Sequence, residues 1–385
     1  MKILHLTWEY PPRIIGGISR HVYYIAQELA NLGNEVYVVT LEFPNTPFEE
    51  HYNNVYVYRV KVEFPSYDFL TWVYAFNHFF EKKVAMLNKS FDIIHIHDWL
   101  VAPAGISLKY FFKKPLILTL HSLEIGRVGS ISSPISLVIS SIEWWSTYEA
   151  KKIITTTNFM KQEIINHFKV PENKIEVIFN GIDVNDYNIY VDKNEVKRRL
   201  GIPEHCKIVL FVGRITEQKG VKYLIEASPH VLKNNSNVRF VIVGDGWQIN
   251  EIKQRINDLN LNWAIKLTGY VDDFTLKQII KSADVLVAPS IYEPFGMVAL
   301  EGMASGIPVI VSNIGGFKEI VEHNVDGIRV NPFNIHELAS AILSIINNED
   351  YAKYLVNNAR NKVLKFSWKE VARRTLEVYK SVLEN

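Results

Sequence analysis

The stretch IVLFVGRITEQKGVKYLIEASPHVLKNNSNVRFVIV, residues 208–243, carries the pattern that decides the fold. Short β-rich runs stand at its two ends, at 208–212 and 239–243, and a longer segment with helical periodicity separates them. A strand, a helix and a second strand in this order predict two parallel strands joined by a crossover helix. The charged loop between Gly213 and Gly220 follows the first strand, where open α/β sheets bind their ligands.

The same alternation extends outward over nearly the whole chain. The other β-rich runs lie at 3–7, 36–41, 93–96, 116–120, 153–157, 265–267, 285–288 and 309–311. Strands that alternate with helices are typical of a doubly wound parallel sheet, and here the pattern starts twice. We therefore predict an α/β protein with two Rossmann-like domains.

Turn signals and composition predict the domain boundaries. A turn at 180–183 and a polar stretch at 185–194 place an N-terminal domain at 1–183, a linker at 184–200 and a C-terminal domain at 201–365. Ser367 and Glu370 have the spacing of a capping box, which predicts a last helix within 366–385. This helix could pack on either domain, and a crossing back to the first is one of the two arrangements.

Charge and composition exclude several classes of protein. The 42 Lys and Arg residues balance 41 Asp and Glu residues, so the formal charge of +1 gives no basic excess for nucleic acid. Cys206 is the single cysteine, which excludes an intrachain disulfide and favours a reducing compartment. No signal-peptide pattern follows Met1, and no apolar run reaches a membrane-spanning length. We expect a cytoplasmic protein with peripheral membrane contact at most.

Two strand ends in the first domain carry polar residues. Asp98 and Trp99 follow one strand and His121 follows the next, so Asp98 could accept and His121 donate a hydrogen bond to a sugar, with Trp99 stacked on its ring. Helix capping by Asp98 and a core tryptophan are the alternative. We expect His95 and His97 to face opposite ways on their strand, with one of them structural.

Two glycine-bearing loops precede helices and suit an anion. Gly16 and Gly17 let a phosphate approach a helix N-terminus, although a plain tight turn would use the same residues. In the second domain, Arg214 and Lys219 share one loop and could offset the charge of a diphosphate. A solvated surface loop is the alternative there.

The strongest signal is the stretch from Pro289 to Glu301. Pro294 keeps Glu293 on a loop, Gly296 permits close backbone approach, and Glu301 lies about one turn inside the helix that follows. Two carboxylates thus flank a helix N-terminus, where they could bind neutral hydroxyls beside a phosphate.

An aromatic segment at 69–87 also lies in the first domain. It contains Trp72, Tyr74, Phe76, Phe79 and Phe80, with Lys82 and Lys83 beside them. Aromatic rings suit a glycan, and aromatics beside lysines also suit a lipid-linked acceptor at a membrane surface. A helix that faces the core is the plainer interpretation.

These residues together resemble the retaining GT-B glycosyltransferases of family 4. The resemblance rests on the E-x7-E pair Glu293 and Glu301, on the phrases 293–296 and 301–304, and on the phrase 95–99, which is similar to bacterial and archaeal glycogen synthases. It implies two Rossmann-like domains that face a central cleft. It also implies metal-independent transfer of a hexose, with glucose expected, from a nucleotide-diphosphate sugar to a glycan or a lipid-linked or other hydroxyl acceptor, without a cofactor.

The resemblance also implies roles for single residues. Arg214 and Lys219 would hold the diphosphate, Glu301 the ribose, and Glu293 and His121 the donor sugar. The other donor-binding residues would be Gly16, Gly17, Gly213, Gly269, Tyr270, Gly296, Met297 and Val298, and the acceptor side would carry Asp98 and Trp99. No Asp-x-Asp motif occurs in the chain, and no metal is expected.

One departure keeps the acceptor open. Glycogen synthases usually have Lys-x-Gly-Gly in the first loop, whereas this chain has Ile14-Ile15-Gly16-Gly17, so only Arg13 could replace the lysine. Glucan elongation is therefore one acceptor hypothesis among several. Two other classes compete with a transferase: a nucleotide-sugar 2-epimerase on the same fold, and a two-domain sugar-binding protein without catalysis.

Overall fold

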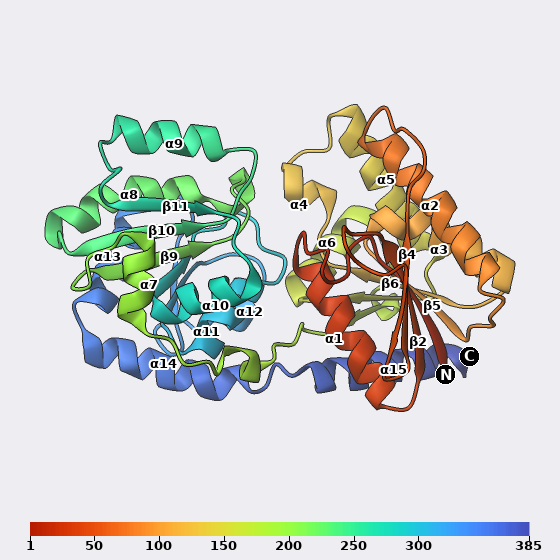
Figure 1. Cartoon of the computed structure of the whole chain (residues 1–385). Coiled ribbons are helices and arrows are strands. Elements are labelled where there is room, and N and C mark those ends of the chain that lie inside the picture. The colour runs from red at the N-terminus through yellow and green to blue at the C-terminus, as the bar shows by residue number, and fades with distance from the viewer. Residues whose placement is uncertain (385) are drawn as a thin grey trace. The chain divides into compact units, whose positions relative to one another are not determined.

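The computed structural model describes residues 1–384 and divides the chain into two compact units (Figure 1). Unit 1 comprises Met1–Gly181 together with the C-terminal segment that begins at Ser367, and unit 2 comprises Ile182–Phe366. Each unit is an α/β structure with its own sheet. The two domains expected from the sequence therefore correspond to two sheets.

The sheet of unit 1 has eight strands in the order β3-β4-β2-β1-β5-β6-β7-β8. The strands are β1 (Lys2–Leu6), β2 (Glu35–Leu41), β3 (Glu49–Tyr52), β4 (Val55–Val60), β5 (Ile93–His97), β6 (Leu116–Leu120), β7 (Lys152–Thr155) and β8 (Ile175–Val177). Neighbours pair in parallel except β3, which is antiparallel to β4. The expected doubly wound parallel sheet is confirmed, and it carries one antiparallel edge strand, β3, which reads Glu-Glu-His-Tyr and is exposed throughout.

Helices cover both faces of this sheet. They are α1 (Gly17–Asn31), α2 (Phe69–Met86), α3 (Ala102–Phe112), α4 (Glu124–Val128), α5 (Pro134–Glu149), α6 (Asn158–Phe168) and α15 (Trp368–Leu383), with 3₁₀ helices η1 (Trp99–Val101) and η2 (Glu172–Lys174). The helices α2, α3 and α5 pack beside one another on the sheet, and α1 packs on α15. The last helix thus belongs to unit 1, where the Tyr379 hydroxyl lies 2.5 Å from Nδ1 of His95.

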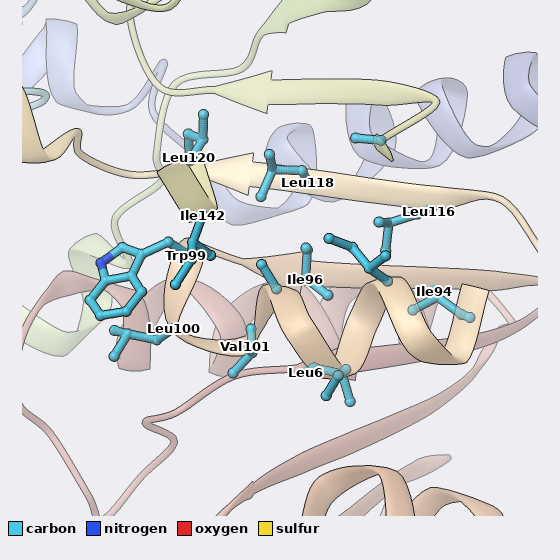
Figure 2. Close-up of a cluster of buried hydrophobic side chains, with 14 of the residues drawn as sticks. Leu6, Ile94, Ile96, Trp99, Leu100, Val101, Leu116, Leu118, Leu120 and Ile142 are labelled. Atoms are coloured by element: carbon cyan, nitrogen blue, oxygen red, sulfur yellow. The ribbon is translucent and has the colours of Figure 1, made fainter. Parts of the chain in front are cut away.

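Alternation along the strands sets the two faces apart. Leu6 of β1 points into the apolar core with Ile94 and Ile96 of β5 (Figure 2), and Leu4 belongs to the same cluster. Because successive strand residues point to opposite faces, His5 faces the other side. Phe76 and Phe80 of α2 are fully buried in the core, which supports the plainer interpretation of the aromatic segment.

The sheet of unit 2 has six parallel strands in the order β11-β10-β9-β12-β13-β14. They are β9 (Lys207–Val212), β10 (Val238–Val243), β11 (Ile265–Gly269), β12 (Val285–Ala288), β13 (Val309–Ser312) and β14 (Ile328–Val330). The helices are η3 (Val184–Tyr187), α7 (Lys193–Leu200), η4 (Glu217–Lys219), α8 (Val221–Asn234), α9 (Ile249–Asp258), α10 (Asp273–Ser282), α11 (Met297–Ser305), α12 (Phe317–Ile320), α13 (Ile335–Ile346) and α14 (Glu349–Val363).

Residues 184–200, expected as a linker, lie inside unit 2. Lys277 of α10 pairs with Asp186 of η3 at 3.3 Å, and α7 packs on α10. The chain leaves unit 1 after Gly181 and returns to it at Ser367, and the N–H of Ile182 donates to the carbonyl of Phe366 at 2.8 Å. The two crossings of the chain are therefore adjacent.

Strand order locates the ligand-binding edge in each unit. The order reverses beside the first strand of each sheet, since β1 lies between β2 and β5 and β9 lies between β10 and β12. Ligands of open α/β sheets bind beyond the carboxyl ends of the strands at such a switch point. The loops after β1, β5, β9 and β12 are consequently the places to look for a site.

Candidate active site

The loops after β9 and β12 are joined closely in unit 2. The N–H of Ile291 donates to the carbonyl of Gln218 at 2.8 Å. Gly220 has φ +63°, and a Cβ atom there would lie 2.0 Å from the carbonyl oxygen of Pro289. Any side chain at Gly220 would collide with backbone, so glycine is required for the two loops to approach.

Lys219 and Glu293 meet across this junction. Nζ of Lys219 donates to Oε2 of Glu293 at 2.8 Å, and the hydroxyl of Ser290 donates to the same oxygen at 3.1 Å. Glu293 is 6% exposed and Lys219 is half-buried. The carboxylate is thus held in a fixed position with a cation beside it, 74 residues away in the chain.

The loop continues into the N-terminus of α11. Gly296 has φ +112°, and a Cβ atom there would lie 2.5 Å from the ring of Phe317. The N–H of Gly316 donates to the Glu293 carbonyl at 2.9 Å, which fixes the loop from the β13 side. First-turn amides such as those of Met297 and Val298 lack intrahelical acceptors, and the helix dipole is positive there, so this end suits a phosphate.

The remaining predicted residues of unit 2 surround these loops. Glu301 is buried in α11. Arg214, just beyond Gly213, is exposed and forms no ion pair within residues 1–384. Gly269 has φ +71° and accepts the N–H of Gly244 at 2.9 Å, and Tyr270 after it is 73% exposed. Cation, carboxylates and helix N-terminus therefore belong to neighbouring loops of one sheet edge.

In unit 1, Glu9 organises the loop that carries the paired glycines. Its Oε2 atom accepts the N–H groups of Ile15 at 2.6 Å and of Gly16 at 2.8 Å. Burial raises the pKa of Glu9, and these two hydrogen bonds oppose the rise. Sequence reasoning missed this role, although a carboxylate at the end of a strand was the available signal. Arg13 lies with its guanidinium 5.6 Å from the ring centre of Trp8.

Asp98 fixes the loop that carries His121. Its Oδ1 atom accepts the His121 N–H at 2.7 Å. Asp98 has φ +60°, an unfavourable backbone conformation for a residue with a side chain, and such strain is concentrated at functional sites. Burial raises the pKa of Asp98 to about 6, opposed by the charge of Arg127 and by hydrogen bonds from the loop. Asp98 is a positioning group here, and the alternative of helix capping is wrong, since its side chain forms no cap hydrogen bond to η1.

Trp99 lies in the core. It is 4% exposed and belongs to the cluster drawn in Figure 2, with Leu100 and Ile142 near it. The ring therefore has no open face for a sugar, and the alternative of a core tryptophan describes it. A tryptophan just after a strand suits a core and a sugar site equally well, so the sequence left both interpretations open.

His95 and His97 point to the same face of β5, and the expectation of opposite faces is wrong. Residues two apart in a strand share a face, since the side-chain period is two. Their rings are stacked with centroids 4.4 Å apart. His5 pairs with His95 in the register of β1 and β5, and His21 of α1 packs edge-on against His121 at 4.6 Å. Five histidines thus gather on this face, four of them buried and His121 half-buried, and they include His5 and His21, which sequence reasoning had not connected with His121.

Solved structures share this fold over the full chain. Sucrose-phosphate synthase from Thermosynechococcus elongatus superposes with a TM-score of 0.84 at 24% identity, covering 100% of this chain and 99% of the other. Anabaena HepE, solved with UDP and glucose, gives 0.81 at 22% identity, covering 99% and 100%. The fold is the GT-B fold of glycosyltransferases.

Two family models match consecutive parts of the chain. The model described as Glycosyltransferase Family 4 matches residues 15–186, and the model described as Glycosyl transferases group 1 matches residues 192–362. Unit 1 accounts for most of the first match and unit 2 for all of the second.

Relatives match from end to end. An uncharacterised glycosyltransferase of Methanocaldococcus jannaschii is 40% identical over 390 residues, covering 100% of this chain and 99% of the relative. A glycogen synthase of Mycobacterium tuberculosis is 32% identical over 398 residues, covering 98% and 94%. The chain belongs to the family 4 glycosyltransferases and is a transferase of the glycogen synthase-like type. No helix within residues 1–384 is long and apolar enough to cross a membrane.

Proposed function

We propose that the protein transfers a hexose, with glucose the expected one, from a nucleotide-diphosphate sugar to a hydroxyl acceptor, with retention and without a metal ion. The observation that carries this proposal is the Glu293 carboxylate, held by Lys219 and Ser290 next to the N-terminus of α11. A fixed carboxylate suits sugar hydroxyls, and a cation with free amides suits the diphosphate. Groups for the sugar hydroxyls and groups for the diphosphate of one donor therefore lie on adjacent loops.

The donor roles follow from chemistry and from the relatives. Lys219 and Arg214 would bind the diphosphate, Glu301 the ribose hydroxyls, and Glu293 a hydroxyl of the sugar. HepE was solved with UDP and with UDP-glucose, which supports a nucleotide sugar as the donor class. From unit 1, the loop of Gly16 and Gly17, ordered by Glu9, would supply further amides for phosphate.

The bond to be broken joins the anomeric carbon to the diphosphate oxygen. As it breaks, positive charge grows on the sugar ring and negative charge on the departing diphosphate. Lys219 and Arg214 lower the barrier by stabilising the negative charge, and the Glu293 carboxylate favours the positive one. We infer that the acceptor hydroxyl attacks from the side that the diphosphate leaves and gives its proton to a diphosphate oxygen, which retains the configuration.

The cationic side chains also explain the proposed independence from metal. A divalent ion in nucleotide-sugar enzymes offsets the charge of the diphosphate, and fixed basic side chains can do the same. Lys219 and Arg214 lie on one loop after β9. The donor site proposed here therefore needs no ion for leaving-group stabilisation.

A glucan is the first acceptor class. Glycogen synthase and α-maltose-1-phosphate synthase of mycobacteria are 32% and 28% identical over nearly the whole chain, which supports an acceptor that contains glucose. Asp98, on the loop after β5, would contact this acceptor, and its Oδ1 atom also accepts the N–H of His121, the residue proposed for the donor sugar.

A lipid-linked acceptor is favoured by one specific surface. The outer face of α5 carries no exposed charge between 134 and 148. Its exposed large apolar side chains are Ile135, Leu137, Trp144, Trp145 and Tyr148, beside the exposed Pro134 and Ser141. A cavity of about 350 Å³ opens beside it, lined by Tyr74, Leu137, Val138, Ser141, Ile142 and Trp145. Tryptophan and tyrosine with a lysine beside them are typical of proteins that lie on a lipid surface, and Nζ of Lys174 donates to the carbonyl of Tyr148 at 2.8 Å. The proposed occupant is the lipid part of such an acceptor.

The donor proposal is tested by incubating the protein with ADP-, UDP- and GDP-glucose and measuring released nucleotide diphosphate, with and without EDTA. We expect release from one donor, unchanged by EDTA and stimulated by maltooligosaccharides if the acceptor is a glucan. Lys219→Ala should lower the rate at least about 100-fold, because leaving-group charge loses its counter-ion. Loss of release in EDTA, or no release from any donor, would contradict the proposal.

The lipid proposal is tested by sedimentation with vesicles of phosphatidylcholine and phosphatidylglycerol. We expect the protein to bind, and Trp144→Gln with Trp145→Gln to weaken binding at least about tenfold, because each ring contributes roughly a kcal/mol or more of apolar transfer. Trp263→Gln is the matched control, an exposed tryptophan of unit 2. Equal sedimentation of wild type and double variant would remove this surface from the proposal.

A further inference from the structure

Three histidines of unit 1 form a row that ends at His121. The rings of His5 and His97 have centroids 5.3 Å apart and are inclined by 20°, and those of His97 and His121 are 5.6 Å apart and inclined by 26°. Nδ1 of His5 lies 3.0 Å from Nε2 of His97, and Nδ1 of His97 lies 3.4 Å from Nε2 of His121. The second link is longer and weaker than the first.

Each ring in the row is neutral. Burial lowers the pKa of His5 and of His121 to about 3, and burial together with the neighbouring histidines holds the pKa of His97 well below its ordinary value. A neutral imidazole has one N–H donor and one acceptor nitrogen. Adjacent rings must therefore agree on the direction of the hydrogen bond they share. Only two arrangements satisfy both links: all three protons on Nδ1, or all three on Nε2.

The buried end of the row distinguishes the two arrangements. Nε2 of His5 is buried and has no hydrogen-bond partner in the part of the chain that the structure describes. With the protons on Nδ1 this atom is an unpaired acceptor, and with the protons on Nε2 it is an unpaired donor. Among buried backbone groups, unpaired N–H donors are rarer than under-satisfied acceptors. The same preference at His5 favours the arrangement with protons on Nδ1.

The other histidines of this face do not join the row. Both nitrogens of His95 have partners, since Nδ1 lies 2.5 Å from the Tyr379 hydroxyl and Nε2 lies 2.7 Å from Oγ1 of Thr119. Nδ1 of His21 lies 2.8 Å from Oδ1 of Asn180, to which it donates. Neither His95 nor His21 forms a hydrogen bond with the row. The choice between the two proton arrangements therefore rests on Nε2 of His5.

We infer that His5 and His97 hold His121 in the tautomer with its proton on Nδ1, so that His121 offers an N–H donor to an oxygen of the bound sugar. Nδ1 of His121 takes no part in the row, whose link to His97 uses Nε2. His5 is a positioning residue, because it acts on His121 only through His97. The catalytic part of this inference rests on the proposed function, whereas the tautomer does not.

The tautomer is measured directly by NMR on protein labelled with ¹⁵N-histidine, with the His121 signals assigned from His121→Gln. We expect His121 of the wild type to be protonated on Nδ1, and His5→Leu to give a mixture of both tautomers. A proton on Nε2 in the wild type overturns the inference, and so does an unchanged His121 tautomer in a folded His5→Leu. The wild-type result needs neither a folded variant nor an active enzyme.

Kinetics test the consequence for transfer. We expect His5→Leu to lower kcat roughly tenfold with the donor KM changed less than twofold, as for loss of a hydrogen bond used in the transition state. His5→Asn should restore most of kcat, because its amide can donate to Nε2 of His97. His78→Leu, at an exposed histidine of α2, is the control. Equal kcat in His5→Leu and wild type contradicts the role of the row, whereas the expected tautomer in a protein that transfers no sugar contradicts the proposed function alone.

Discussion

Replacing Glu293 by glutamine should lower kcat by about 100- to 1000-fold, with the donor KM changed far less. Glutamine keeps the size of the side chain and an oxygen for Ser290, but it removes the negative charge beside Lys219. The charge that favours the developing positive sugar ring is then lost, and preorganised groups of this kind contribute on this scale in other enzymes. Steady-state rates of nucleotide diphosphate release measure the effect.

Glu226→Gln provides a matched control for this variant. Glu226 is also a carboxylate of unit 2 in an ion pair, with Nε of Arg255 at 2.5 Å, and it lies on α8, outside the candidate site. We expect its kcat to stay within about twofold of the wild type, because Glu226 lies outside the candidate site. The protein should also stay folded, since a partly exposed ion pair contributes little to stability. A Glu293→Gln protein with near wild-type kcat would show that this carboxylate does not act on the reacting sugar.

Acid should destabilise unit 1 steeply below about pH 6.5. Five histidines, four of them buried and His121 half-buried, have lowered pKa values: His5, His21, His95, His97 and His121. A histidine whose pKa is lowered on folding stays neutral in the folded protein while the unfolded chain takes up a proton below about 6.5. Stability is therefore lost as the pH falls from there toward about 3, the pKa of His5 and His121.

Four carboxyl groups of unit 1 whose pKa is raised by burial act in the opposite direction: Glu9, Glu81, Asp98 and Glu143. Burial raises the pKa of Asp98 to about 6 and that of Glu143 to about 8, so these groups stabilise the folded state at low pH and lose that contribution as the pH rises. Five histidines against four carboxyl groups still leave a net loss of stability in acid. One proton of difference corresponds to about 1.4 kcal/mol per pH unit, and we expect at least this slope between pH 6 and 5.

Urea unfolding at pH 7, 6 and 5, followed by tryptophan fluorescence, measures this slope. His5→Asn removes one of these five histidines. It should lower the change in unfolding free energy by about 1.4 kcal/mol per pH unit, the contribution of one proton. His78→Asn replaces an exposed histidine of the same unit and should leave the slope unchanged. Equal stability at pH 7 and 5 would contradict the claim that the five histidines are neutral in the folded protein.

The alternation of strands and helices was sufficient to predict two doubly wound parallel sheets, and the resemblance to family 4 added the GT-B fold. Runs such as 208–212 and 285–288 are buried on both faces of a parallel sheet, so their sequences are continuously apolar and easy to recognise. The exposed edge strand β3 has no such signal. The family 4 phrases around Glu293 and Glu301 then allowed the class of enzyme to be predicted, which end-to-end relatives confirm.

The contacts inside the site depended on strand pairing that a single sequence does not contain. Glu293 and Lys219 could each be placed after a strand, but their ion pair depends on β9 and β12 being neighbours. The histidine row depends likewise on the β1–β5 register, in which His5 stands opposite His95. Trp99 was ambiguous because a tryptophan at a strand end suits a core and a sugar equally well.

The most direct test of the central claim is a ¹H NMR time course of the α-configured nucleotide-diphosphate glucose that the donor panel selects, with a hydroxyl acceptor and EDTA present. We predict that the anomeric signal of the donor disappears while that of an α-linked glucoside grows at the same rate, and that nucleotide diphosphate accumulates. A β-linked product would contradict retention, and a donor left intact in EDTA but consumed with added metal would contradict metal independence. Conversion of the donor to its 2-epimer, with no glycoside formed, would replace the transferase by an epimerase.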